Sequence, residues 1–242
     1  MTRSRFEEQY FEDPNFNPGL KGGDEVSGYG YYPGYFPVIQ AQLAALVELT
    51  EAATLLDAGC GKGALAEYAR TCLLLDAVGS DISAYATRMA RRREGGDKTV
   101  RAACDHLPFA DEAFDLVWSN GVLQYLTPEE ARGSLAEIGR VTRVAAFVSN
   151  IAAAAQQEDW GRQDTMTRLY LRPAQWESLA RQQGFTAVAL PYEGESAILL
   201  LKQASPLLPL RLVDLSLGYM RRLGCLPRPP AGLEAFHRRF SR

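Results

Sequence analysis

The sequence predicts an α/β fold in which a mostly parallel sheet is covered by helices on both faces. Short apolar segments alternate with longer helical segments through the first five expected strands, which is typical of parallel sheets. The last two expected strands, 186–190 and 197–202, have no helix between them and are predicted to pair antiparallel. A glycine-rich turn after the first strand adds a third sign of this class.

The chain is organised around residues 54–64, which read TLLDAGCGKGA. A short apolar strand reaches Asp57, and Gly59, Gly61 and Gly63 follow at every second position. Glycine is needed where the backbone takes a positive φ or lies against a ligand. The helix expected directly after the turn offers unpaired N–H groups at its start. Strand, turn and helix together predict a nucleotide-type cofactor site.

Capping residues and apolar periodicity predict the other elements. Pro37 suits the first position of a helix that leads to the strand at 54. Ser83 is expected to cap a helix over 84–93. Thr127, with Glu130 three residues later, predicts a capping box for a helix that ends near 141. The remaining expected elements are strands at 77–81, 99–103, 114–119 and 145–149 and a helix from Pro173 to about Gly184.

Length and composition exclude several classes of protein. The chain has 242 residues and a net charge of −3, which suits one domain with additions and gives no reason to expect nucleic acid as the main partner. No signal-peptide core and no apolar run of roughly 18 residues are present, so a cytoplasmic protein is expected. The four cysteines, at 60, 72, 104 and 225, lack paired spacing, and neither a metal site nor a disulfide is predicted.

Residues 1–48 are predicted to form an N-terminal lid or cap. The stretch 12–37 is rich in glycine and proline and carries a cluster of tyrosines, so it is not expected to be one regular element. Long irregular segments in compact domains are often functional. In one interpretation its aromatic residues close over a ligand, with Tyr29 and Tyr31 lining an acceptor pocket. In the other, the segment is a flexible arm packed on the surface.

Residues 204–242 form a basic extension with a helical stripe of apolar side chains. Leu208, Leu212, Leu215 and Tyr219 recur at helical spacing, with arginines at 211, 221 and 222. Three interpretations are open: a helix packed on the domain, an oligomer contact, or a basic amphipathic helix on a membrane surface. A membrane contact would suit a lipid-soluble acceptor.

Two classes of cofactor compete for the glycine turn. Gly59, Gly61 and Ala64 satisfy G-x-G-x-x-G/A and Asp81 lies about 20 residues on, as a dinucleotide-binding oxidoreductase would have it. Asp57 argues against this class, because its carboxylate would face a pyrophosphate of like charge. The same carboxylate suits a cationic amino group. A ligand with an ammonium, a ribose diol and an adenine, but no phosphate, fits better.

S-adenosylmethionine is such a ligand, and at this point the sequence resembles the class I S-adenosylmethionine-dependent methyltransferases. LLDAGCGKG is similar to their glycine-rich first motif, GSDIS to their ribose-binding segment, and DHLPFADEAFDLVWSNGVLQYL to the region of their third and fourth strands. The closest branch methylates small molecules and includes quinone-biosynthesis enzymes. The resemblance implies a Rossmann-like seven-stranded sandwich over 49–203, methyl transfer to a small-molecule acceptor, and S-adenosylhomocysteine as product.

The resemblance also implies roles for individual residues. Asp57 would lie near the methionyl amino group, and Asp81 would accept hydrogen bonds from the ribose hydroxyls. The other implied cofactor contacts are Gly59, Cys60 and Gly61 along the methionyl and ribose portion, Ile82 against the adenine face, Cys104, Asp105 and His106 at the adenine edge, and Ser119 and Asn120 near the reacting methyl group.

The chain departs from the family in two places. Relatives usually place an acid where this chain has Ala103, and Asp105 stands two residues later. Some relatives have a histidine after the fourth strand where this chain has Gln124 and Tyr125, so no catalytic base is assigned. Gln124 and Tyr125 remain candidate acceptor contacts, with ordinary packing as the alternative. From another class, the chain could be a catalytically silent cofactor-binding subunit. The acceptor atom and the oligomeric state stay open.

Overall fold

The computed structural model describes most of the chain. The described residues are 6–13, 35–149, 168–169, 171, 173–191, 197–203, 205, 207–225 and 233–240. The predicted acceptor contacts Tyr29 and Tyr31 lie outside them.

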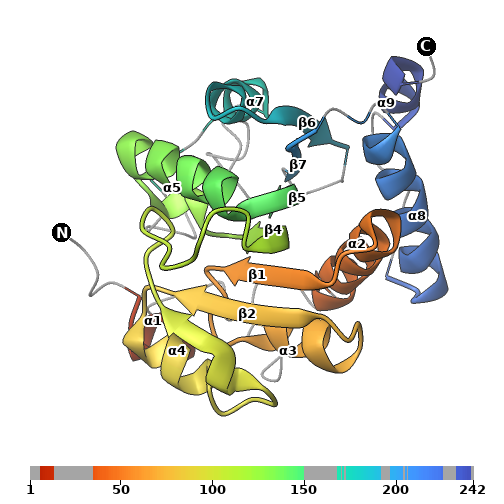
Figure 1. Cartoon of the computed structure of the whole chain (residues 1–242). Coiled ribbons are helices and arrows are strands. Elements are labelled where there is room, and N and C mark those ends of the chain that lie inside the picture. Colours follow the sequence, from red (N-terminus) through yellow and green to blue (C-terminus); the bar gives the residue numbers. More distant parts are fainter. Residues whose placement is uncertain are drawn as a thin grey trace.

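A seven-stranded sheet in the order β3-β2-β1-β4-β5-β7-β6 forms the centre of the molecule (Figure 1). β1 pairs in parallel with β2 and β4, β2 with β3, and β4 with β5. β7 runs antiparallel to both β5 and β6, so the predicted antiparallel pair is confirmed. The strands are β1 (Thr54–Ala58), β2 (Asp76–Asp81), β3 (Thr99–Arg101), β4 (Phe114–Asn120), β5 (Thr142–Ser149), β6 (Thr186–Leu190) and β7 (Ala197–Leu201).

Two of the predicted caps fix the starts of helices beside the sheet. The Ser83 hydroxyl accepts the Ala86 amide at 3.0 Å, and Thr127 and Glu130 form the reciprocal bonds of a capping box. α2 begins two residues before Pro37, which a first turn tolerates because its amides have no partner within the helix. The helices are α1 (Glu8–Glu12), α2 (Tyr35–Thr50), α3 (Ala64–Thr71), α4 (Ala84–Ala90), η2 (Gly96–Lys98), η3 (Leu123–Tyr125), α5 (Pro128–Val141), α7 (Pro173–Gln182), α8 (Leu208–Arg222) and α9 (Leu233–Phe240).

Helices cover both faces of the sheet, as the sequence predicts. Neighbouring residues of a strand point to opposite faces. Leu55 therefore belongs to a core shared with α2, α3 and α8, whereas Leu56 belongs to a core shared with α5 and α7. Figure 1 shows α5 and α7 on one side of the molecule and α2 beside α8 on another. The two cores leave the carboxyl ends of β1, β2 and β4 at a common edge.

Helix α8 of the C-terminal extension packs on the domain, which is the first of the three interpretations of its apolar stripe. Leu212 is fully buried, and Tyr219 hydrogen-bonds Glu48 on α2. Leu208 and Leu215 pack against the same core. Among the described residues, no helix combines the length and the apolar character needed to cross a membrane.

Candidate cofactor site

The glycine turn joins the end of β1 to α3 and is tied to β2. Gly59, Gly61 and Gly63 have φ values of +82°, +54° and +81°, a region that residues with a Cβ rarely adopt. A Cβ on Gly59 would also overlap the side chain of Val122. The amides of Gly59 and Cys60 both donate to the Ser80 carbonyl, at 2.7 and 2.9 Å. The turn therefore requires the glycines that the sequence places there.

Asp57 lies in the middle of the sheet, opposite Gly79 on β2 and Trp118 on β4. Its side chain is buried, with 2% of the residue exposed. Burial and then the charge of Asp81 raise its pKa to about 7, while the Ala66 amide and Arg70 oppose the rise. Its Oδ2 has no hydrogen-bond partner among the described residues. A buried carboxyl oxygen without a donor is costly, so this atom is a candidate ligand contact.

Asp81 ends β2 and faces the glycine turn. Its Oδ2 accepts the Gly61 amide at 2.8 Å, and its Oδ1 accepts the Ser83 amide at 2.9 Å. Burial raises the pKa of this carboxyl, and the two amides act against that rise. Each carboxylate oxygen can accept a further hydrogen bond, so this orientation leaves acceptor capacity for a diol.

Ser119 and Asn120 stand at the end of β4, beside the same edge. The Ser119 hydroxyl is buried and has no hydrogen-bond partner within the described part of the chain. The Asn120 Oδ1 accepts the Ser149 hydroxyl at 2.8 Å, which fixes this side chain against the end of β5. The unpartnered atoms of Asp57 and Ser119 therefore belong to adjacent strands at one end of the sheet.

Two cysteines lie close to these carboxyl groups. The Cys60 sulfur packs so tightly on β2 that a Cβ on Gly79 would be 2.9 Å from it. Burial raises the pKa of the Cys60 thiol well above its usual value, and burial with the charge of Asp81 raises that of Cys104 to about 12. Both thiols stay protonated at neutral pH and are poor nucleophiles. Ile82 is half-buried, and its carbonyl accepts the Arg101 side chain at 3.0 Å.

Asp105 and His106 lie in the loop after β3, next to α5. The Asp105 carboxylate is 3.1 Å from the Nδ1 of His106, whose side chain is 83% exposed. A Cβ on Gly133 of α5 would be 3.3 Å from the Asp105 Cβ. The structure therefore places Asp105 against α5, and its contact with adenine remains a prediction.

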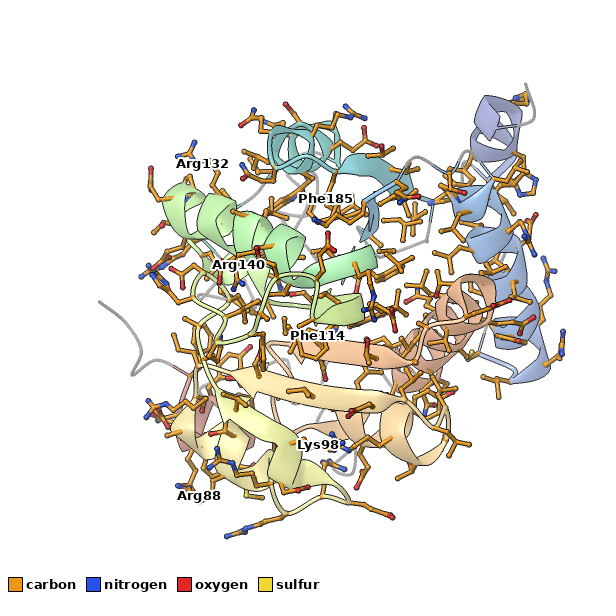
Figure 2. The ribbon with its side chains drawn as sticks, viewed as in Figure 1. Arg88, Lys98, Phe114, Arg132, Arg140 and Phe185 are labelled. Atoms are coloured by element: carbon orange, nitrogen blue, oxygen red, sulfur yellow. The ribbon has the colours of Figure 1, made fainter. Side chains whose placement is uncertain are left out.

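Arg140 on α5 fixes the next part of this loop (Figure 2). It donates to the carbonyls of Leu107 and Phe109 at 3.0 and 2.7 Å. Its neighbour Glu137 accepts the Leu107 amide at 2.8 Å. Hydrogen bonds thus hold the Leu-Pro-Phe segment, residues 107–109, against α5. The sequence did not predict this arrangement.

Gln124 and Tyr125 are both buried on η3, just past β4. The Gln124 carbonyl accepts the amides of Arg168 and Leu169 at 2.8 and 3.0 Å. The Tyr125 hydroxyl is 3.2 Å from the hydroxyl of Tyr10 on α1. Sequence reasoning missed α1 at this edge, although its aromatic pair at 10 and 11 within an acidic segment was a usable signal.

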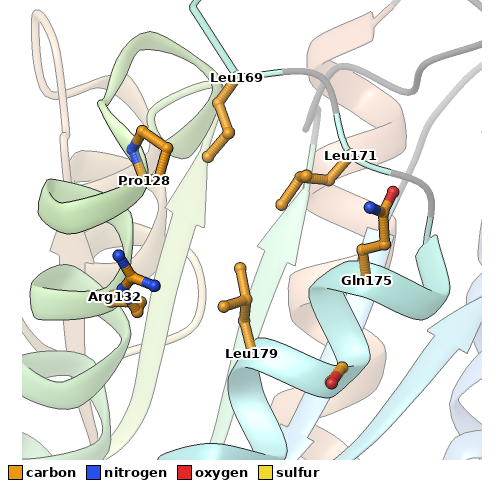
Figure 3. Close-up of a pocket in the computed structure, with 7 residues that line it drawn as sticks. Pro128, Arg132, Leu169, Leu171, Gln175 and Leu179 are labelled. Atoms are coloured by element: carbon orange, nitrogen blue, oxygen red, sulfur yellow. The ribbon is translucent and has the colours of Figure 1, made fainter.

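A cavity of about 300 Å³ lies between α5 and α7 (Figure 3). Leu169, Leu171 and Leu179 give it a mostly apolar lining, and Arg132 stands at its side. None of the predicted cofactor contacts lines it. Leu169 connects this cavity to the edge described above, because its amide donates to the Gln124 carbonyl.

Comparison with known proteins agrees with this geometry. The sequence model of a family described as "Methyltransferase domain" matches residues 56–148, the part that contains the glycine turn, Asp81 and the end of β4. The match supports a class I methyltransferase domain over residues 56–148. The predicted fold class, a Rossmann-like seven-stranded sandwich, is confirmed.

Curated relatives match this domain over part of their length. A malonyl-[acyl-carrier protein] O-methyltransferase from Enterobacter lignolyticus is 36% identical over 93 residues, which are 38% of this chain and 35% of that protein. A tRNA (carboxymethyluridine(34)-5-O)-methyltransferase from Arabidopsis thaliana is 32% identical over 120 residues, 49% of this chain and 28% of that protein. The chain thus spans about a third of the length of these relatives.

Solved structures share the fold at low identity. An S-adenosylmethionine-dependent methyltransferase from Archaeoglobus fulgidus superimposes with a TM-score of 0.56 at 15% identity, over 68% of this chain and 93% of that one. The match extends the methyltransferase fold beyond residues 56–148.

Proposed function

We propose that the chain binds S-adenosylmethionine at the carboxyl edge of β1, β2 and β4 and transfers its methyl group to a small-molecule acceptor. Asp57 carries this proposal: a buried carboxyl group with an unpartnered oxygen suits the cofactor's ammonium group. Asp81 would bind the ribose hydroxyls, and the turn at Gly59, Cys60 and Gly61 would lie along the cofactor with its backbone. When bound, the cofactor supplies a methyl group on a sulfonium, and the protein supplies orientation and electrostatics.

The same carboxyl group argues against the nicotinamide alternative. A dinucleotide would bring its pyrophosphate to the glycine turn, beside the carboxyl groups of Asp57 and Asp81. Two acids at this point repel an anion and attract a cation. The further alternative, a silent cofactor-binding subunit, differs from an enzyme in one measurable property: it would show no turnover in the absence of a partner.

We infer that the methyl group goes to an oxygen of a carboxylate. Both curated relatives are named as O-methyltransferases, and a malonyl and a carboxymethyl group each carry a carboxyl group. The chain has two histidines, and neither stands at the end of β4: His106 is in the exposed loop after β3, and His237 pairs with Asp214 on α8. A carboxylate has already lost its proton at neutral pH, so its attack needs no base.

Binding and transfer are tested separately. Calorimetric titration with S-adenosylhomocysteine and with NADH is expected to show micromolar binding of the first alone, lost in Asp81→Ala. Transfer of labelled methyl is then measured on a panel of small carboxylates, amines, phenols and thiols. Labelled, base-labile methyl esters from the carboxylates are expected. Binding of NADH would overturn the cofactor, and labelling confined to amines or thiols would overturn the acceptor.

A further inference from the structure

The short helix α1 lies against the edge where the cofactor is proposed to bind (Figure 1). Although it is far from the site in sequence, it contacts the elements that follow β1, β2 and β4. Phe11 stacks on Tyr85 of α4, with ring centroids 6.0 Å apart. Phe6 and Tyr10 both contact the ring of Tyr125 on η3. Residues 6–11 therefore contact both α4, which follows β2, and η3, which follows β4.

Glu12 fastens α1 at its C-terminal end. Its Oε1 accepts Lys62 Nζ at 3.1 Å, and Lys62 belongs to the glycine turn. The same oxygen accepts the Tyr85 hydroxyl at 2.8 Å, and Tyr85 belongs to α4, just after Asp81. Glu7, at the other end, accepts the Tyr85 amide at 3.2 Å. Glu12 thus links α1 to the glycine turn, which donates to Asp81, and to α4, which follows Asp81 in the chain.

The ring of Phe11 comes close to the centre of the proposed site. A Cβ on Gly61 would be 3.7 Å from Phe11 Cε1, and the Gly61 amide donates to Asp81. Glu7 also lies near enough for its charge to act on the Asp81 carboxyl group. Asp81 is 7% exposed in this arrangement. A ribose bound to Asp81 would therefore have the aromatic ring of Phe11 as its neighbour.

We propose that residues 6–13 form a latch over the cofactor's ribose, and that Glu12 is the positioning residue that holds the latch closed through Lys62 and Tyr85. This inference rests on the proposed function. Phe11 completes the wall of the ribose site, and cofactor exchange requires the latch to open. Because a bound cofactor can leave only when the latch opens, the contacts of Glu12 are expected to slow its dissociation.

The latch is tested with Glu12→Gln against Glu8→Gln. Both variants remove one negative charge from an exposed side chain of α1, but Glu8 forms no hydrogen bond or ion pair with the described residues. The dissociation rate of S-adenosylhomocysteine, measured by stopped-flow displacement, is expected to rise about threefold to fivefold in Glu12→Gln, because the Glu12 side chain is 43% exposed and solvent screens its ion pair. In Glu8→Gln the rate is expected to match wild type. Tyr85→Phe keeps the ring and removes one of the two bonds, so a smaller rise is expected.

A second readout needs no cofactor. Hydrogen exchange of residues 6–13 in the ligand-free protein is expected to be faster in Glu12→Gln than in Glu8→Gln, while exchange in β1 and β4 is unchanged. Equal dissociation rates and equal exchange in the two variants would overturn the latch. If wild type binds no S-adenosylhomocysteine at all, the proposed function itself fails, and the latch over a cofactor fails with it.

Discussion

Two aspartates lie on neighbouring strands in the centre of the sheet. Asp57 is near the carboxyl end of β1, and Asp115 is near the amino end of β4, so they lie toward opposite ends of the strands. The Asp115 Oδ2 accepts the amides of Ala53 and Thr54 and the Thr54 hydroxyl, all at 2.9–3.0 Å. Its Oδ1 accepts Arg143 at 2.8 and 2.6 Å. Asp57, which is more deeply buried, keeps one oxygen without a partner in the described structure.

The pKa values of the two carboxyl groups move in opposite directions. Burial acts to raise the pKa of Asp115, but the bonds from Ala53, Arg143 and Thr54 outweigh it and hold the pKa below its usual value. Burial dominates at Asp57 and raises its pKa to about 7. A carboxyl group with a structural role is thus satisfied by the protein itself. The Asp57 carboxyl group is buried with its acceptor capacity kept open, at a cost in stability, as the proposed binding of a cationic ligand requires.

The largest expected effect is the loss of cofactor binding in Asp57→Asn. Truncating one partner of a buried charged pair typically costs about 2–5 kcal/mol, so the dissociation constant for S-adenosylmethionine should rise by roughly 30-fold or more. Calorimetry on wild type and variant measures it. Asp115→Asn serves as the matched control, with affinity expected to be unchanged. Equal affinity of Asp57→Asn and wild type would remove the ligand-binding role of Asp57.

The next effect concerns stability and falls on Asp115. Asp115→Ala leaves Arg143 and the amides of Ala53 and Thr54 without their acceptor, so the free energy of unfolding should fall by about 2–3 kcal/mol. Urea unfolding at pH 8 measures this change. Asp57→Asn, which removes a carboxylate that is buried without a full set of partners, is expected to leave stability equal or higher at this pH. A larger loss in Asp57→Asn than in Asp115→Ala would reverse the comparison.

The comparison is sharpened by pH. The folded-state pKa of Asp57 lies above the unfolded value, so the folded protein binds a proton more tightly, and this stabilisation is lost as pH rises from about 4 through about 7. Asp115 has the opposite sign: its stabilisation is present above its usual pKa and is lost as pH falls through the lowered value. The stability of ligand-free wild type should therefore decline relative to Asp57→Asn between pH 5 and pH 8. Parallel stability curves over this range would contradict the raised pKa.

The smallest expected effect is that of Asp105→Asn. Asp105 packs against α5 and pairs with an exposed histidine, so at most one hydrogen bond to adenine is at stake. Such a bond is worth about 1 kcal/mol, and cofactor affinity should fall about fivefold or less. A loss as large as that of Asp57→Asn would mean that Asp105 moves toward the cofactor on binding.

Much of the fold follows from local signals in the sequence. The Ser83 and Thr127 caps, the strand that starts at Thr54 and the antiparallel final pair all depend on residues close together in the chain, and each is confirmed. The third strand is shorter than expected, since after Arg101 the chain turns into the loop that holds Asp105. Predicted roles for Asp57 and Asp81 came from a motif, and the structure brings both to one edge.

The rest depended on contacts that no local pattern encodes. α1 reaches the site across 50 residues to Lys62 and 73 residues to Tyr85, so its place could not be read from its own sequence. The unpartnered oxygen of Asp57 likewise depends on the fact that no other described element brings a donor to it. A motif predicts which residues lie close together. Burial and hydrogen bonding in the folded chain determine which of their polar atoms keep free acceptor capacity.

The most direct test is the proton balance of S-adenosylmethionine binding at pH 6. Wild type is titrated by calorimetry in two buffers that differ in ionisation enthalpy, with Asp57→Asn in parallel. Because Asp57 is mostly protonated at this pH and must ionise to pair with an ammonium, wild type should release close to one proton on binding. Asp57→Asn should release none. Binding by wild type with no net release would mean that Asp57 does not meet the cofactor's charge.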